Sequence, residues 1–208
     1  MRSIFSGTSL LVLCVAVGAA SAQTNPQASV WTHGTTASGL AAFATDGPRS
    51  GPALGGAVGW EITPRIGLEG DATWLRFGAG LSAFSASLKG RVRFFGTRPL
   101  DPFFEAGVGL YRASVSTNTT EPVPAFYQRR LREGLAPDGS GTTFTDPSFV
   151  AGGGVNIYIH RQFALRPVVD MTLVLGNGDR YVVTTVGVQA VFHFEDHPVT
   201  PSIARRRR

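Results

Sequence analysis

The stretch that most constrains the fold lies near the end of the chain, between Tyr181 and Phe194. Its even-numbered positions carry only valine, threonine, alanine and phenylalanine, and they end in Phe192 and Phe194. Its odd-numbered positions are mixed and include Gln189 and His193. Because successive side chains of a β-strand point to opposite faces, this alternation predicts a strand with one apolar face. That face is either buried in a soluble protein or turned toward lipid in a transmembrane barrel.

The chain begins with the features of a secretory signal peptide. Arg2 supplies a positive charge, an apolar run extends from Leu10 to Ala20, and Ala20-Ser21-Ala22 has the small residues of a cleavage site. At 11 residues the apolar run is too short for a membrane-spanning helix of about 20. We therefore expect export and the removal of residues 1–22. The single cysteine, Cys14, is lost with them, so the mature chain has no disulfide and no thiolate metal site.

The net charge of +5 and the isoelectric point near 10.1 raise the question of an anionic partner such as a nucleic acid. The excess of basic residues in the mature chain is accounted for by Arg205–Arg208 at its end. The body of the protein is therefore balanced, and it lacks the basic patch that a nucleic-acid-binding domain needs. We expect no nucleic-acid partner.

Further stretches alternate in the way that the closing stretch does. A weak first strand is expected between Gln27 and Phe43, and turn signals such as Asn177-Gly178 separate the later ones. The later expected strands are Ala53–Ile62, Ile66–Trp74, Ser85–Phe94, Phe103–Val115, Phe149–Ile159 and Phe163–Leu175. With the closing strand they predict an all-β fold, an eight-stranded antiparallel up-and-down transmembrane β-barrel covering residues 23–194.

Charged residues in these strands lie on the faces opposite the apolar ones. They are Glu69, Asp71, Lys89, Arg91, Arg93, Glu105, Arg166 and Asp170. The apolar faces carry aromatic residues near the strand ends, as the interfacial girdles of membrane barrels do: Trp60, Trp74, Phe94, Phe104 and Phe163. This combination favours a membrane barrel with a charged interior. The alternative is a soluble periplasmic lipocalin-like barrel that binds a small apolar ligand.

The positions of two turns predict how the charged residues pair across neighbouring strands. The predicted pairs are Glu69 with Arg91, Asp71 with Lys89, and Arg93 with Glu105. Together they would form a charge ladder that fixes the strand register, because a shift by one residue would move every charge to the lipid face. Arg166 and Asp170 are expected to form a lesser cluster across the interior.

From about residue 53 to residue 194 the chain resembles the small OmpA-like outer-membrane barrels of the porin family. The stretches that carry the resemblance are GGAVGWEITPRIGLEGDATW, PFFEAGVGLYR and the end of the barrel sequence from FALRPVVDM to VFHF. The resemblance implies an outer-membrane location, surrounding lipid, and a terminal aromatic signal, here Phe192 and Phe194, that the barrel assembly machinery reads. We expect a monomer without a cofactor. Residues 195–208 depart from the family as a basic periplasmic tail, and eight strands leave no room for an open solute channel.

Some eight-stranded outer-membrane barrels modify lipid A with a histidine near the outer leaflet. The candidates here are His33, His160, His193 and His197. His160 and His193 are expected at the periplasmic rim, and His33 lies in the uncertain first strand without a carboxylate partner. We therefore expect a structural or surface-interaction role, no enzyme activity, and no catalytic, metal or cofactor site. A lipid A-modifying enzyme remains an alternative.

The expected connection from Ser116 to Pro147 is the longest and should face the outside of the cell. It holds Phe126 and Tyr127 beside three arginines, Arg129, Arg130 and Arg132. This composition suits contact with lipopolysaccharide phosphates or another surface partner. It equally suits a solvated loop that contains a short helical turn.

Overall fold

The computed structural model describes residues 34–47, 49–78, 80–116, 125–134, 141–176 and 180–198. These residues form eight strands and one helix, and their bounds are β1 Gly34–Thr45, β2 Ser50–Glu61, β3 Ile66–Arg76, β4 Leu81–Arg93, β5 Leu100–Ser116, α1 Ala125–Gly134, β6 Gly141–His160, β7 Phe163–Leu175 and β8 Arg180–His193. The predicted signal peptide, residues 1–22, and Arg205–Arg208 lie outside the described residues.

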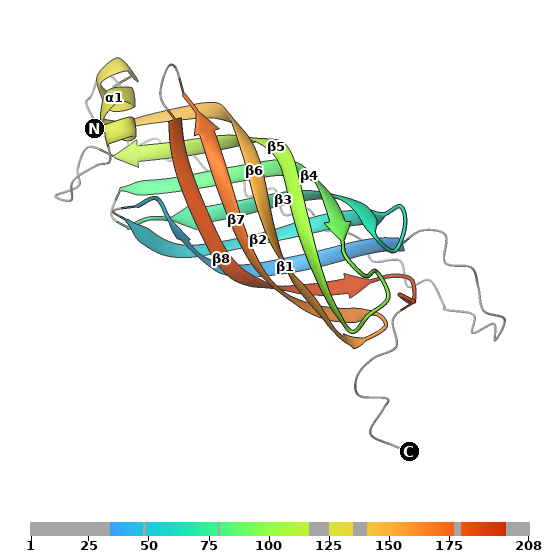
Figure 1. Ribbon diagram of the computed structural model, residues 1–208. Coiled ribbons are helices and arrows are strands. Elements are labelled where there is room, and N and C mark those ends of the chain that lie inside the picture. Colours follow the sequence, from blue (N-terminus) through green and yellow to red (C-terminus); the bar gives the residue numbers. More distant parts are fainter. Residues whose placement is uncertain are drawn as a thin grey trace, which may run out of the picture. The chain divides into compact units, whose positions relative to one another are not determined.

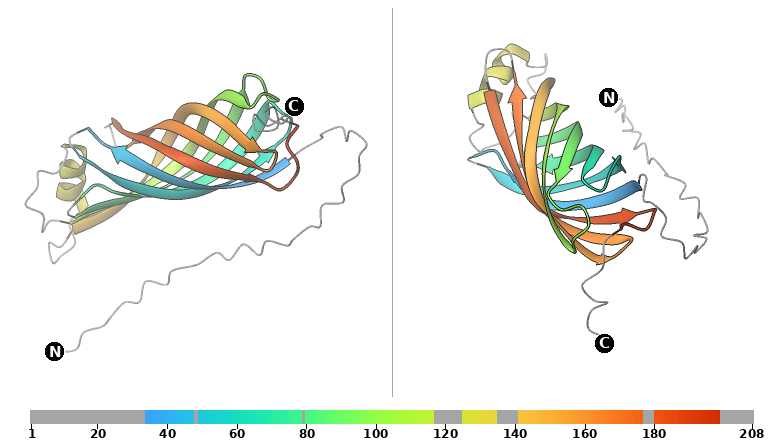
Figure 2. Two further views of the ribbon diagram at one scale, coloured as in Figure 1. Left: turned by 90° about the horizontal axis from the view of Figure 1, so that it is seen from below. Right: turned by 45° about the vertical axis from the view of Figure 1, so that its right-hand side comes forward.

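The strands form one closed barrel in which each strand is antiparallel to the next (Figure 1). The barrel closes between β1 and β8, whose pairing runs from Thr36 opposite His193 to Thr45 opposite Thr184. The weakly predicted first strand is therefore a full member of the sheet. The eight-stranded antiparallel barrel is confirmed. Two further views follow the tilted strands around the barrel (Figure 2).

The outer face of the barrel is apolar and its inner face is largely polar. Exposed apolar side chains on the outside include Leu54, Val58, Trp60, Trp74, Leu88, Phe104, Val108, Phe149, Met171, Val186 and Val188. The charged side chains of the strand interiors point inward instead, and Lys89, Glu105 and Arg166 are almost completely buried. A soluble lipocalin-like barrel would require the reverse arrangement, so the outer surface suits lipid.

One connection of the barrel is far longer than the rest, whereas the other connections at its end, 46–49, 77–80 and 176–179, are as short as those at the opposite end. The turns 62–65, 94–99 and 161–162 are short and lie at the end where β1 begins and β8 ends. The connection 117–140, which includes α1, lies at the other end. Transmembrane barrels have short periplasmic turns and longer external loops, and by that convention we call the α1 end the outer end and the opposite end the inner end.

The long connection is shorter than the sequence predicted. We expected it to extend from Ser116 to Pro147, but β6 already begins at Gly141 and pairs with β5, Ser116 lying opposite Gly141. The stretch from Gly141 to Pro147 contains three threonines, which favour strand structure although the stretch has no apolar face. With 17 and 20 residues, β5 and β6 are longer than the 9–11 residues that cross a membrane, so their ends extend past it.

Within the described part of the chain, α1 is the one helix, and no helix there is long and apolar enough to cross a membrane.

Candidate functional site

The interior of the barrel is the candidate functional site, and its central layer is a network of ion pairs. Lys89 Nζ lies 2.6 Å from Glu105 Oε1, 3.3 Å from Asp170 Oδ2 and 3.4 Å from Asp71 Oδ1. Arg91 Nη2 lies 2.6 Å from Glu105 Oε2 and 2.7 Å from Glu69 Oε1. β4 therefore supplies two cations that bind carboxylates of the neighbouring strands and of β7 across the interior.

The network extends to the far wall through Arg166 of β7. Its Nη1 atom lies 3.0 Å from Glu69 Oε2 and donates a hydrogen bond of 2.9 Å to Gln189 of β8. Its Nε atom donates to Asn156 of β6 at 2.7 Å. Arg166 is 0% exposed. Side chains from six of the eight strands thus meet in one connected cluster, which fills the middle of the barrel.

The glycines that line this layer make room for the charged side chains. A Cβ atom on Gly152 of β6 would collide with the carboxylate of Asp170. One on Gly107 of β5 would collide with the backbone of β4 next to Lys89. Larger residues at these two positions would push the strands or the ion pairs apart.

The predicted register of the charged strands is wrong by two residues. Glu69 lies opposite Lys89 rather than Arg91, Asp71 lies opposite Ser87, and Glu105 lies opposite Arg91 rather than Arg93. The reason is that each of the two hairpin turns is centred one residue earlier than we assumed, which moves every pair by two. A shift by two keeps each side chain on the same face of the sheet.

Long side chains bring two of the predicted pairs together in spite of this shift. Glu69 contacts Arg91 and Asp71 contacts Lys89, each along a diagonal between the strands. The third pair is wrong, because Arg93 lies outside the central network and forms an ion pair with Glu61. Arg166 and Asp170 do not form a separate lesser cluster, since both join the central network.

A second cluster fills the inner mouth, at the end with short turns. Arg93 Nη1 lies 2.9 Å from His197 Nε2 and 3.1 Å from the hydroxyl of Tyr158. The rings of Tyr158 and His197 stack with centroids 4.5 Å apart. His193 Nδ1 and His197 Nε2 each lie 3.7 Å from Glu61 Oε2. The residues that follow β8 therefore fold across the inner mouth.

His197 is held in its neutral form in this cluster. Burial and the neighbouring Arg93 guanidinium lower the pKa of His197 to about 3. A guanidinium can only donate hydrogen bonds, so Nε2 of His197 must accept one, which also requires the neutral ring. Sequence reasoning assigned His197 to the tail and missed this role. The sequence did contain one signal for this cluster: Glu61, Arg93 and His193 occupy strand positions whose side chains face the interior.

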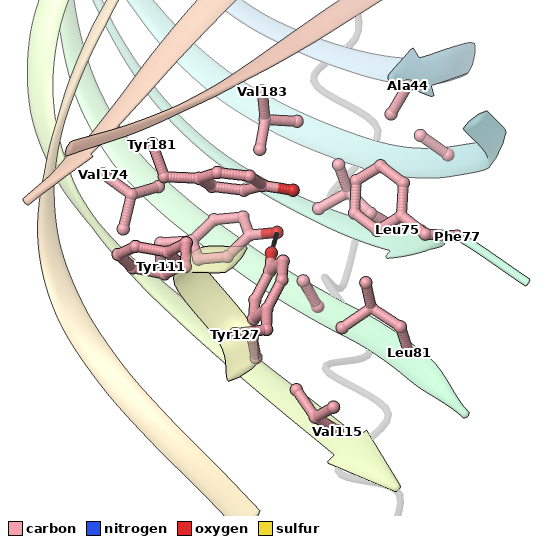
Figure 3. Packing of buried hydrophobic residues seen from close by; sticks show 14 residues of the cluster. Ala44, Leu75, Phe77, Leu81, Tyr111, Val115, Tyr127, Val174, Tyr181 and Val183 are labelled. Atoms are coloured by element: carbon pink, nitrogen blue, oxygen red, sulfur yellow. Dashed lines mark hydrogen bonds between the residues drawn. The ribbon is translucent and has the colours of Figure 1, made fainter. Parts of the chain in front are cut away.

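Helix α1 packs onto the barrel at the outer mouth, where its Tyr127 meets Tyr111 of β5 within a cluster of buried side chains (Figure 3). Phe126 stacks on Tyr181 with ring centroids 5.0 Å apart, and the hydroxyls of Tyr127 and Tyr111 are 2.9 Å apart. These rings belong to one buried apolar cluster, whose other members are Ala44, Ala53, Leu75, Phe77, Leu81, Ala83, Ala113, Val115, Val174 and Val183. Of the two interpretations of this connection, the surface-partner one would leave Phe126 and Tyr127 available to the partner. Their burial shows that they instead anchor the helix, while Arg129 and Arg132 are exposed.

Between the ion-pair network and this apolar layer there is little empty space. The cavity lined by Asp71, Lys89, Tyr111 and Asp170 has a volume of about 30 Å³. A site of this size and polarity accommodates water and no larger solute. Within the described residues no group of three or more histidine, cysteine, aspartate or glutamate side chains is arranged to hold a metal ion.

The two predicted assembly-signal aromatics lie on the outside of the barrel at the end of β8. Phe192 and Phe194 are both exposed, and their rings meet edge to face with centroids 5.4 Å apart. They are therefore accessible from the lipid side, close to the inner mouth.

Residues 8–194 match the family described as the outer membrane protein beta-barrel domain. The chain belongs to this family. Among solved structures, Neisserial surface protein A is similar with a TM-score of 0.54 and 13% identity, over 77% of this chain and 96% of that one. The N-terminal β-barrel domain of Pseudomonas aeruginosa OprF is similar with a TM-score of 0.51 and 15% identity, over 76% and 99%. No protein of curated function matches the chain.

Family membership places the protein in the outer membrane and confirms the sequence-based resemblance to small outer-membrane barrels. At identities of 13% and 15% the two structures establish the fold and nothing more specific.

Proposed function

We propose that this protein is a closed, non-conducting outer-membrane barrel that holds helix α1 and its flanking loop at the cell surface for interaction with another molecule. The observation that carries the proposal is the filling of the interior at three levels. The central ion-pair network, the inner-mouth cluster around Arg93 and the apolar cluster under α1 each place buried side chains in the interior. An interior of this kind serves stability and presentation rather than solute passage.

The surface-interaction part of the proposal concerns the connection 117–140. Burial of Phe126 and Tyr127 fixes the helix on the barrel, and Arg129 and Arg132 remain exposed on its outer side. A positioned helix with an exposed basic face suits an anionic partner, either lipopolysaccharide or a surface molecule. We propose that the barrel acts as a monomer surrounded by outer-membrane lipid and that the assembly machinery reads Phe192 and Phe194.

We also propose that the protein is not a lipid-modifying enzyme. His193 and His197 lie in the inner mouth, and the acid near them, Glu61, is already paired with Arg93. His160 is the last residue of β6, at the end with short turns. His33 lies outside the described residues. In the proposed orientation His160, His193 and His197 are remote from the outer leaflet, in which lipid A resides.

Protease treatment of intact cells tests this presentation. Trypsin added from outside should cut within 117–140 and spare Arg205–Arg208, whereas permeabilised cells should lose both. Cleavage of the arginine tail from outside would reverse the orientation and remove the basis of the proposal.

Mass spectrometry of lipid A from cells that overproduce the protein should show no change in acylation or phosphorylation, and a new lipid A species would indicate an enzyme.

A further inference from the structure

A polar patch interrupts the apolar outer wall of the barrel near its outer end. The strand registers place Trp74, Phe84, Arg112 and Thr145 side by side in one outward row across β3 to β6. The next row toward the outside consists of Arg76, Ser82, Ser114 and Thr143. We call these two rows the wall patch. It lies on the outer wall of the strands and is distinct from α1 and the barrel interior.

The level of the wall patch in the membrane follows from the residues around it. The rows below it are apolar and include Leu110, Leu88 and Val108. An arginine on the lipid face costs about 2–4 kcal/mol at the bilayer midplane and about 0–1 near the interface. Trp74 and Phe84 are the aromatic residues typical of that interface. Arg112 and Arg76 therefore lie at the headgroup level of the outer leaflet.

The exposed charges described at this end of the barrel are of one sign. The exposed charged side chains described there are all arginines: Arg76, Arg112, Arg129, Arg132 and Arg180. The exposed carboxylates among the described residues are Glu195 and Asp196, and both lie at the opposite end. No described carboxylate forms an ion pair with Arg76 or Arg112. A binding partner of opposite charge for the wall patch is therefore an anionic group in the outer leaflet.

The spacing of the two arginines suits one large headgroup. Arg76 and Arg112 are on strands separated by β4, which corresponds to about 10 Å across the sheet. Guanidinium groups bind phosphate through two parallel hydrogen bonds, and Ser82, Ser114, Thr143 and Thr145 add hydroxyl groups suited to a sugar. The apolar rows below offer a surface for the acyl chains of the same molecule.

We propose that the wall patch binds a phosphorylated glycolipid of the outer leaflet, namely lipopolysaccharide, through Arg76 and Arg112. The site is independent of any partner of α1, because it uses the outer wall of β3 to β6 alone. It would fix one lipid molecule against the barrel at the point where the strands leave the membrane.

The test compares two double variants of the full-length protein, purified and folded in detergent. Arg76→Gln/Arg112→Gln removes the two proposed ligands, and Arg65→Gln/Arg161→Gln makes the same charge change on exposed arginines of the opposite end. Folding is checked by heat-dependent gel mobility. Native mass spectrometry then follows titration with short-chain lipopolysaccharide, with the same lipid after enzymatic removal of its phosphates, and with phosphatidylglycerol.

The proposal predicts that the wild type and the control variant bind lipopolysaccharide equally, and that the Arg76/Arg112 variant binds at least about tenfold more weakly. Removal of the lipid phosphates should weaken binding to the wild type by a similar factor. Unchanged binding by the Arg76/Arg112 variant would overturn the proposal, and so would equal binding of the dephosphorylated lipid or of phosphatidylglycerol. If the double variant does not fold, each single variant must weaken binding, and unchanged binding by both singles would overturn the proposal as well.

Discussion

The contact between Glu69 and Arg91 offers the sharpest test of the central network. Their charged atoms lie 2.7 Å apart, and the two side chains are 1% and 5% exposed. Breaking a buried ion pair costs about 3–5 kcal/mol when one charge is left without a partner. Each residue here keeps a second partner, Arg166 for Glu69 and Glu105 for Arg91. We therefore expect Glu69→Gln and Arg91→Gln each to lower the free energy of unfolding by about 3 kcal/mol, the lower end of that range.

The double variant separates the contact from the other effects of each change. Both single changes break the same ion pair, so the double change loses it only once. The expected interaction energy between the two sites is above about 1 kcal/mol. It is measured by urea unfolding of the barrel in detergent, followed by tryptophan fluorescence, with gel mobility as the measure of the folded fraction.

Glu105→Gln with Arg93→Gln is the matched control. The sequence-based register placed these two charges opposite each other, but in the structure Arg93 binds Glu61 and Glu105 binds Lys89 and Arg91. Because they share no partner, their effects should add to within about 0.5 kcal/mol. Additive losses for Glu69 and Arg91 would refute the observed network. Strong coupling of Arg93 with Glu105 would instead favour the register that we first expected.

Three further changes test other parts of the barrel. Phe194→Ser should reduce insertion into the outer membrane because Phe194 ends the lipid-facing row of β8, and unchanged amounts of heat-modifiable protein there would contradict this. His197→Ala should lower the free energy of unfolding at pH 7.5. The difference in unfolding free energy between this variant and the wild type should narrow as the pH falls below about 6.5 toward 3, because the unfolded histidine takes up a proton that the folded one, with its lowered pKa, does not. A difference that stays constant with pH would contradict the docked neutral ring. Tyr127→Phe removes the hydroxyl contact with Tyr111 and should cost about 1 kcal/mol of unfolding free energy, without loss of the folded state; an unchanged urea midpoint would mean that the contact adds nothing.

The strand architecture could be predicted because a lipid-facing wall and a polar interior impose a strict alternation of apolar and polar residues along each strand. Every charged residue of the central network lies on the inward face that its parity indicated, from Glu69 in β3 to Asp170 in β7. The exact register could not be predicted, because parity is unchanged by a shift of two residues. Only the turn geometry fixes that choice, and the glycines near residues 78–80 fit more than one turn centre.

The two mouths of the barrel were not predictable in the same way. Helix α1 has no long amphipathic pattern, and its position depends on Phe126 and Tyr127 reaching an apolar pocket formed by seven strands. His197 follows the end of β8, so no strand periodicity assigns it a face. Both elements are placed by contacts between residues far apart in the chain, and the inward parity of Glu61, Arg93 and His193 marks only the strand side of one of these contacts.

Single-channel recording tests the central claim of a closed interior most directly. Full-length protein, folded and inserted into planar bilayers, should give no stable conductance steps at moderate voltage, because the ion-pair network, the inner-mouth cluster and the plug under α1 fill the interior. A general porin recorded in the same bilayers serves as the positive control. Reproducible, long-lived steps from the purified protein would contradict the account.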